Sequence, residues 1–277
     1  MSVFIFFPAL FAEQKNESTT YLPDLKLKLD KPLMLDKETD SANLIFVMKN
    51  KVSKNLALMT DLLAEQELRL WGETKSRETW RYEVAIYNNR QVFRKIEPGG
   101  KFGKERFALP IPGIGVRPGQ EWHDLFKHLV TTPVSYQGVS SYKGKIVQVF
   151  SYKAFSQDKV CHYTERNSFF SNWDGAVGCS GRVVVDEQFN VLQIFQELYL
   201  PEGLLSSTLF ISVNYEFVGL GENQELLRLP VSIEMAAQFN RDRKWYFASG
   251  MWKNYRRFRA KSDVIFPQVE SNITYPK

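Results

Sequence analysis

The chain has 277 residues, of which 44% are apolar and 14% aromatic, and its formal net charge is +5 at pH 7. A chain of this length buries roughly three quarters of its unfolded surface, so one large core or two small ones can form. The net charge is far below that of a dedicated nucleic-acid binder, so we expect no specific nucleic-acid partner. Because 21 Phe and 12 Tyr suit a pleated, half-buried surface, the composition favours strands over a helical bundle.

The first twelve residues, MSVFIFFPALFA, carry no charge and end in a small residue just before the polar Glu13-Gln14-Lys15. This pattern is typical of the apolar region and cleavage site of a secretory signal. We therefore expect an exported protein of the periplasm or cell envelope whose mature chain begins at or near Glu13. The run lacks the Lys or Arg expected at its start, and Leu10 fits poorly three residues before the cut, so the true translation start stays open. The alternative to a secretory signal is a buried N-terminal strand.

Residues 13–41 are rich in Pro, Lys and Asp and are predicted to be a polar linker. After it, apolar residues recur at spacings of three and four, which predicts an amphipathic helix over 42–59 with Ser41 as its N-cap. The apolar stripe consists of Ile45, Met48, Val52, Leu56 and Met59.

The apolar period then changes from about 3.6 to two, which indicates strands with one buried and one wet face. The first such stretch holds Leu62, Ala64, Gln66, Leu68 and Leu70, and the second runs from Trp80 to Tyr87. Asn88-Asn89 separates it from Arg90–Ile96 and predicts a two-residue hairpin turn, because Asn tolerates a positive φ.

A Gly- and Pro-rich loop over 97–119 precedes QEWHDLFKHLV, which predicts a second, inserted helix. Further strands are expected at 145–153, 160–166, 181–186, 191–198, 208–218, 226–235, 245–250 and 251–266. Without helices between them a βαβ fold is excluded. The pattern therefore predicts a mainly β fold, a meander of about ten antiparallel strands with one N-terminal and one inserted helix. This domain spans 42–266 and is followed by a C-terminal tail, 267–277.

Two cysteines, Cys161 and Cys179, fit an oxidising compartment, in which an even pair can form one disulfide. The stretch between them carries turn-forming residues, so the two thiols could face each other near the base of a long hairpin. The alternative is a pair of buried free thiols. Neither cysteine has the neighbours that a zinc site needs.

The other chemistry-bearing residues do not form a recognisable catalytic or cofactor motif, so we expect no cofactor, no metal and no enzyme. His123 and His128 are five residues apart on the predicted helix, which separates their side chains by about 140°. Cys161 and His162 are strand neighbours that point to opposite faces. The turn Gly178-Cys179-Ser180-Gly181 departs from a hydrolase serine elbow because Arg182 follows and no helix does.

The segment 241–261 interleaves basic and aromatic residues, a composition that can bind phosphates or anionic lipid headgroups. Arg257, Arg259 and Lys261 share one side of the predicted strand and are the candidate residues for an anionic membrane surface. The same composition also arises when aromatic residues face the core and basic residues face water, and that solvated face is the alternative.

Several stretches resemble a family of uncharacterised exported proteins known mainly from soil bacteria: YKGKIVQVFSYKAF, GRVVVDEQFNVLQIFQE, LPVSIEM, NYRRFRAKSDVIF and NLALMTDLLAEQELRLW. The resemblance covers roughly 43–266. That family is similar in outline to the outer-membrane lipoprotein carriers of the LolA/LolB type, in which a curved sheet half-closes around helices and holds an acyl chain. The resemblance implies that the strands of this chain form a single curved antiparallel sheet, a half-barrel. The chain departs from the family at Ala64-Glu65-Gln66, where a cysteine and hydroxyl residues are common.

The leading prediction is a non-enzymatic envelope protein that binds a lipid, a lipoprotein or another apolar ligand in the half-barrel. The predicted lining consists of Trp80, Tyr82, Val84, Ile86, Phe150, Tyr152, Ile194 and Phe210, which lie on apolar strand phases. Two alternatives stay open: an interaction or envelope-sensor module with a closed core, and a hydrolase with two convergent carboxylates. The sequence does not predict an oligomeric state.

Overall fold

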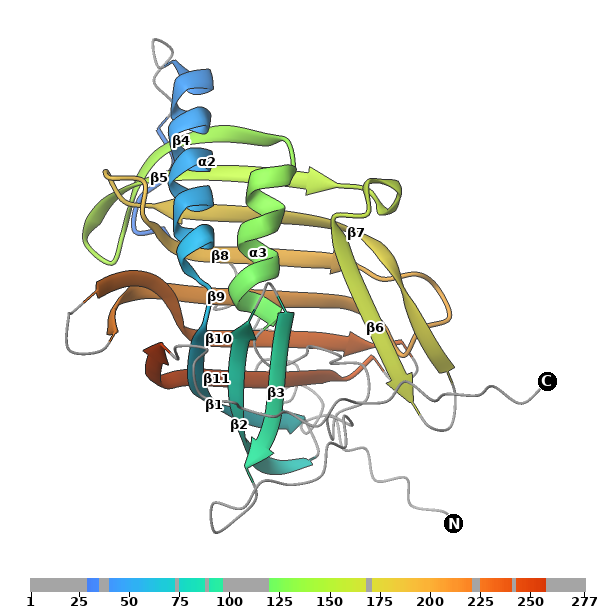
Figure 1. Ribbon diagram of the computed structural model, residues 1–277. Coiled ribbons are helices and arrows are strands. Elements are labelled where there is room, and N and C mark those ends of the chain that lie inside the picture. Colours follow the sequence, from blue (N-terminus) through green and yellow to red (C-terminus); the bar gives the residue numbers. More distant parts are fainter. Residues whose placement is uncertain are drawn as a thin grey trace, which may run out of the picture.

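The computed structural model describes residues 29–34, 40–72, 75–87, 90–96, 120–167, 171–220, 225–240 and 243–257. These parts form two α-helices and one sheet (Figure 1). The helical elements are α2 (Ser41–Leu58), α3 (Gln120–Thr131) and the short η1 (Ser156–Asp158). The strands are β1 (Leu62–Gly72), β2 (Lys75–Tyr87), β3 (Arg90–Ile96), β4 (Val134–Tyr142), β5 (Lys145–Ala154), β6 (Cys161–Asn167), β7 (Ser171–Val185), β8 (Val191–Tyr199), β9 (Ser206–Leu220), β10 (Glu225–Phe239) and β11 (Trp245–Arg257).

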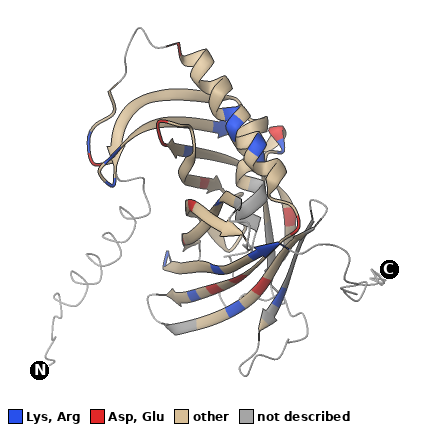
Figure 2. Ribbon diagram, turned by 60° about the vertical axis from the view of Figure 1, so that its left-hand side comes forward, with Lys and Arg blue, Asp and Glu red and all other residues tan. Residues whose placement is uncertain are grey.

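The strands of the described residues pair antiparallel in the order β3-β2-β1-β11-β10-β9-β8-β7-β5-β4, and β6 pairs with β7 beside this path. The sheet is open, with β3 and β4 at its two edges. Figure 2 shows that it curves, with the helices on its concave side. The predicted fold class, a curved antiparallel half-barrel with an N-terminal and an inserted helix, is confirmed.

The predicted meander is wrong in one respect, because one of the two strands beside β1 is distant from it in the sequence. β1 lies between β2 and β11, with Leu68 opposite both Trp80 and Gly250. The chain then passes from the β3 edge to the β4 edge, and α3 lies between these two strands in the sequence. This pairing joins strands that are far apart in the sequence, and no local pattern encodes it.

Helix α2 forms where the three-and-four spacing predicts it, and Met48 and Val52 are buried against the sheet. Its N-cap is Asp40 and not Ser41: the Asp40 carboxylate accepts a hydrogen bond of 3.1 Å from the backbone N–H of Asn43. Asp and Ser are both strong N-cap residues, so the composition of this turn could not choose between them.

One strand was not predicted. β4 has the sequence VSYQGVSSY, in which serines and a glycine weaken the alternation, and its register shifts between Tyr136 and Gly138. As an edge strand it buries less apolar surface than a central one. Its backbone therefore depends on pairing with β5 more than on its own composition.

Two further strands differ from the predicted bounds. β7 begins at Ser171, so Asn172, Asp174 and Gly175 lie in a strand paired with β6 and not in a turn. β11 continues from Trp245 to Arg257, where two separate strands were predicted. Asn254 has a positive φ of 57° in this strand, at the point where its register with β1 shifts, so the irregularity is a bulge and not a strand end. The predicted turn Asn88-Asn89 lies outside the described residues, although Tyr87 pairs with Arg90 as a two-residue connection requires.

Part of the predicted polar linker lies along the edge strand β4. Residues 29–34, the edge segment, make backbone hydrogen bonds from Asp30 to Ser141 and in both directions between Met34 and Val139. The Asp30 carboxylate also accepts from the backbone N–H of Gly144. Leu29 packs on a small cluster around Val147 and Val149 on the convex face. No helix of the described residues has the length and apolarity that a membrane span requires.

Candidate functional site: the concave face of the sheet

The concave face carries a continuous apolar row that crosses the sheet from β2 to β4. The strand registers place its members directly opposite one another on successive strands. In spatial order the row consists of Trp80, Leu68, Gly250, Ile233, Val213, Ile194, Val183, Phe150 and Tyr136. All of its apolar side chains belong to the main core or pack against it, so this face is buried along the row.

Gly250 is the one member of the row without a side chain, and the space it leaves is filled by its neighbours. A Cβ at this position would lie 2.6 Å from Leu68 Cδ2 and 2.7 Å from Ile233 Cγ2. Both distances are far shorter than van der Waals contact, so the two aliphatic side chains meet over the glycine and keep the row unbroken.

Most of the predicted lining residues lie on this face. Trp80, Tyr82, Val84 and Ile86 come from β2, Phe150 and Tyr152 from β5, and Ile194 from β8, and all belong to the main core or pack on it. The β2 residues lie near one edge of the sheet and the β5 residues near the other, with Ile194 of β8 between them. The structure therefore places the seven residues on one face but not in one contiguous patch.

Phe210 differs from the other predicted lining residues, because it lies on the convex face. There it stacks between Phe195 and Trp245, at ring-centroid distances of 6.0 and 6.1 Å. The stack continues through Phe247 to Trp71 on β1. On β9 the concave phase belongs to Leu209 and Ile211 instead. The phase of Phe210 on β9 is otherwise polar, with Thr208, Ser212 and Asn214, so the alternation itself indicates the convex face for this residue.

The helices fill the centre of the concave face. Phe126 of α3 makes an edge-to-face contact with Tyr215 of β9, with ring centroids 4.9 Å apart, and both side chains are fully buried. α2 lies beside α3, and Lys49 donates a hydrogen bond of 2.8 Å to the carbonyl of Thr132, just past the end of α3. Burial lowers the pKa of Lys49.

Helix α2 is also joined to β10 by a pair of hydrogen bonds. The Asn55 amide donates to the Arg228 carbonyl at 2.8 Å and accepts from the Arg228 N–H at 3.2 Å. The Arg228 guanidinium itself lies over the ring of Phe217 and donates to the carbonyl of Val191. Burial lowers its pKa, opposed by the negative charges of Asp186 and Glu216.

A single glutamine interrupts the apolar phase of β1 on the concave face. Gln66 is 1% exposed and lies between Tyr82 of β2 and Trp252 of β11 in register. Neither its Oε1 nor its Nε2 has a hydrogen-bond partner among the described residues. Gln66 lies in the predicted buried phase of this strand but was not among the predicted site residues. The signal that could have found it is a polar side chain at the centre of an otherwise apolar alternation.

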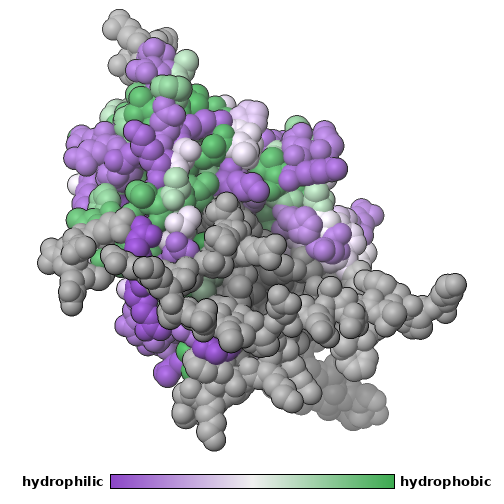
Figure 3. Space-filling view, in the orientation of Figure 1, coloured by the Kyte–Doolittle hydropathy of each residue, from purple (hydrophilic) through white to green (hydrophobic). Residues whose placement is uncertain are grey.

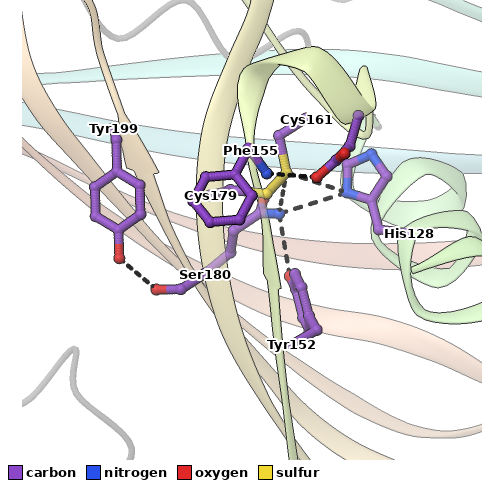
Figure 4. Close-up of a disulfide and its surroundings, with 9 residues drawn as sticks. His128, Tyr152, Phe155, Cys161, Cys179, Ser180 and Tyr199 are labelled. Atoms are coloured by element: carbon purple, nitrogen blue, oxygen red, sulfur yellow. Dashed lines mark hydrogen bonds between the residues drawn. A yellow bond between two sulfur atoms is a disulfide. The ribbon is translucent and has the colours of Figure 1, made fainter. Parts of the chain in front are cut away.

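The predicted disulfide between Cys161 and Cys179 is present, with a Cα–Cα distance of 6.2 Å (Figure 4). It joins β6 to β7, as the hairpin prediction requires, and closing a loop of this length stabilises by roughly 3 kcal/mol on the chain-entropy estimate. Beside it, the Gln196 amide donates to Tyr152 Oη at 3.1 Å and to Cys161 Sγ at 3.0 Å. Burial raises the pKa of Tyr152, and the hydrogen bond from Gln196 acts in the opposite direction. His128 of α3 reaches the same cluster, with Nδ1 3.4 Å from Gln196 Nε2.

Away from the aromatic stack, the convex face of β1, β2 and β11 carries charged side chains, and in Figure 2 charged positions alternate with uncharged ones along strands of this part of the sheet. Glu67 pairs with Arg69 and Arg81, and Glu83 pairs with Arg94 and Arg256. Such exposed pairs contribute little stability individually, at most about 1 kcal/mol each. They mark this face as the wet side of the sheet.

Of the candidates for an anionic surface, Arg259 and Lys261 lie outside the described residues. The Arg257 guanidinium donates to the carbonyls of Thr60 and Leu58, at 2.8 and 3.1 Å, where α2 ends. A cation at this position also interacts favourably with the helix dipole. Binding of these residues to anionic lipid stays a prediction. Around α2 and α3, apolar and polar side chains intermingle on the surface, and Phe46 and Leu58 of α2 are exposed (Figure 3).

The hydrolase alternative predicted two buried carboxylates in a cleft. Among the residues that the structure describes, the buried polar side chains include no Asp and no Glu. Within the same ranges, no group of three or more His, Cys, Asp or Glu residues could hold a metal ion.

Comparison with known proteins gives similarity only to solved structures. No family model matches the chain. No curated protein matches it either. A LolA superfamily protein from Nitrosomonas europaea is 13% identical, with a TM-score of 0.43 over 82% of this chain and 98% of that one. A DUF1329 family protein from Desulfovibrio piger is 9% identical, with a TM-score of 0.40 over 81% and 96% of the two chains. A proposed outer membrane lipoprotein-sorting protein domain from Vibrio parahaemolyticus is 10% identical, with a TM-score of 0.40 over 77% and 93%. A similarity in outline to proteins of the LolA type was predicted from the sequence and is confirmed, at low identity.

Proposed function

We propose that the chain is an exported, non-enzymatic protein of the cell envelope whose concave face binds an acyl chain or another apolar ligand. The observation that carries this proposal is that the apolar row is longer than α2, the helix that lies across it. Strands are spaced by about 4.8 Å, so a row from β2 to β4 is roughly 38 Å wide. An 18-residue helix such as α2 is about 27 Å long.

The contacts of α2 indicate which part of the row it covers. The helix packs near β4, reaches β10 through Asn55 and ends under Arg257 of β11. Six strands from β4 to β10 span about 24 Å, which agrees with the length of the helix. The concave surface of β1 and β2, with Trp80, Tyr82 and Val84, therefore extends beyond its C-terminal end. We propose this end of the concave face as the ligand site.

The energetics favour an acyl ligand at such a surface. Burying one methylene is favourable by about 0.8 kcal/mol, so a ten-carbon chain gains several kcal/mol before the entropy of ordering it is subtracted. Because Tyr82 and Val84 are buried, an incoming ligand must first displace the groups that shield their side chains from solvent. We therefore expect association to be much slower than the typical 10⁵–10⁷ M⁻¹s⁻¹.

Titration with a fluorescent fatty acid tests the proposal. The full chain should bind the probe saturably, and Val84→Trp should weaken binding about tenfold or more, because the larger side chain fills the space that the ligand would take. Ile146→Trp is the matched control: Ile146 is 58% exposed on β5, and its replacement should leave the affinity unchanged. A wild-type protein that shows no saturable binding would disprove the proposal.

Export is tested separately. In native cells, the protein should be found in the periplasmic or envelope fraction, with an intact mass that corresponds to a chain beginning at or near Glu13. A full-length chain in the cytoplasm would contradict export while leaving ligand binding to be judged by the titration.

A closed-core interaction module is the second candidate function. The contact between Phe126 and Tyr215 favours it, because these large, fully buried rings fill the centre of the concavity. In that case the protein would act through its outer surface. It would bind no apolar probe, and the only effect of Val84→Trp would be to destabilise the fold by overpacking.

A further inference from the structure

Gln66 is a buried amide that has no hydrogen-bond partner among the described residues, and it lies in the part of the concave face that we propose as the ligand site. Along β1 it lies between Ala64 and Leu68, and across the sheet it lies between Tyr82 and Trp252. All four neighbours belong to the main apolar core. The Gln66 side chain is 1% exposed, and both of its polar atoms lack a hydrogen-bond partner among the described residues.

The other buried glutamines of the described chain each make at least one hydrogen bond. Gln193 donates to Ser212 Oγ at 2.9 Å on the convex face, although its Oε1 has no partner among the described residues. Gln196 donates to Tyr152 and Cys161. A buried polar group without a partner loses its hydrogen bonds to water and gains none in return, so an apolar residue of the same shape is expected to be at least as stable at that position. Folding therefore gives no reason for an amide at residue 66, and a ligand does.

The amide specifies the chemistry of that ligand. It presents a donor, Nε2–H, and an acceptor, Oε1, side by side. A carboxamide or a protonated carboxyl group presents the complementary acceptor and donor in the same spacing, so the two groups can form a pair of parallel hydrogen bonds. An ester offers only acceptors and would leave Oε1 unpaired in an apolar surrounding.

We propose that Gln66 is the specificity-determining residue of the concave face and selects an acyl ligand whose head group carries both a donor and an acceptor, a carboxamide or a protonated carboxyl. This inference rests on the proposed function, since it names the head group of the same ligand. The head lies at Gln66, between Tyr82 and Trp252, and the alkyl chain lies along the neighbouring apolar row that begins at Trp80 and Leu68.

Two probes with the same chain and different heads test the inference: decanamide, which has a donor and an acceptor, and methyl decanoate, which has acceptors only. Neither titrates near neutral pH, so protonation does not confuse the comparison. The wild-type protein should bind the amide roughly ten-fold or more tightly than the ester, because the ester leaves a buried acceptor unpaired. In Gln66→Leu this ratio should fall to about one, through weaker binding of the amide.

Gln193→Leu is the matched control, since it makes the same replacement at a buried glutamine of the convex face, and it should keep the wild-type ratio. Gln66→Leu should unfold at the same temperature as wild type or a higher one, so loss of the ratio cannot be ascribed to unfolding. If Gln66→Leu does not fold, Gln66→Met gives the same comparison with a flexible side chain.

The outcomes separate the two proposals. If both probes bind with equal affinity to wild type, or if the Leu variant keeps the preference for the amide, apolar binding stands and the role of Gln66 is wrong, its amide then holding only a buried water. If neither probe binds, the proposed function is itself wrong and the inference fails with it.

Discussion

At the scale of single residues, a glycine allows an aromatic ring of the core to lie directly against the backbone of the neighbouring strand. Tyr152 of β5 lies over Gly181 of β7, its partner in register, and a Cβ at Gly181 would collide with the Tyr152 ring. The ring is fixed in this position because its hydroxyl accepts from Gln196 beside the disulfide. Gly181 thus decides where the polar cluster of Figure 4 lies.

Gly181→Ala should therefore lower the free energy of unfolding by about 1–3 kcal/mol, the usual cost of overpacking a core. An alanine elsewhere in a strand is neutral or stabilising by about 0.4–1 kcal/mol, since it restricts the unfolded chain. Gly219→Ala is the control, because the nearest atom to its Cβ, Leu226 Cδ2, is 4.0 Å away. Urea unfolding of both variants measures the difference, and equal stabilities would show that Tyr152 can move without loss.

At the scale of elements, the position of α2 depends on polar contacts as well as on its apolar stripe. Met48 and Val52 bury the helix against the sheet but allow it to slide, since apolar contacts are not directional. The paired hydrogen bonds of Asn55 with the backbone of Arg228 fix its position along β10. From β11, Arg257 then donates to the carbonyl of Leu58, the last residue of α2, and to that of Thr60 just past the helix.

Asn55→Ala should destabilise the protein by about 1–3 kcal/mol, because it removes both hydrogen bonds and leaves backbone groups of Arg228 unpaired. Asn55→Asp keeps the acceptor for the Arg228 N–H but loses the donor, so it should be intermediate. Ser53→Ala, at an exposed position of the same helix, is the control. Chemical denaturation gives the three values, and an Asn55→Ala variant as stable as the control would show that the apolar stripe alone holds the helix.

At the scale of the whole molecule, the open sheet has two edges, and the β4 edge is covered by the chain itself. The edge segment 29–34 occupies backbone groups of Ser141 and Val139 that would otherwise be free to pair with another strand. Uncovered edge strands pair with other copies of the same chain, and natural proteins protect them.

Deleting residues 1–34 should therefore make the protein associate through β4, whereas deleting residues 1–28 should not. The two truncations differ only in the edge segment, so the comparison isolates its effect. Light scattering during size-exclusion chromatography over a range of concentrations measures the association. Identical behaviour of the two truncated chains would mean that other features protect this edge.

The sequence was sufficient to predict those features that repeat over short distances. The stripe from Ile45 to Met59 predicts α2, and the period-two alternation of β1 and β2 predicts two strands with one buried face. The pair Cys161 and Cys179 predicts a hairpin disulfide, which is present. β4 escaped prediction, because its serines and Gly138 carry a weak pattern and its pairing with β5 compensates.

By itself, then, the sequence determined both α-helices, most of the strands, the mainly β class and the buried phase of each clearly alternating strand, because these depend on local periodicity and chain propensity. Only the tertiary structure decided that β1 pairs with β11 and that Arg257 donates to the carbonyl at the end of α2. It also decided that Gln66 is buried with no hydrogen-bond partner in the described part of the chain, whereas Gln196 has several. These outcomes depend on which distant strands the curvature of the sheet brings together, and neither strand phase nor composition contains that information.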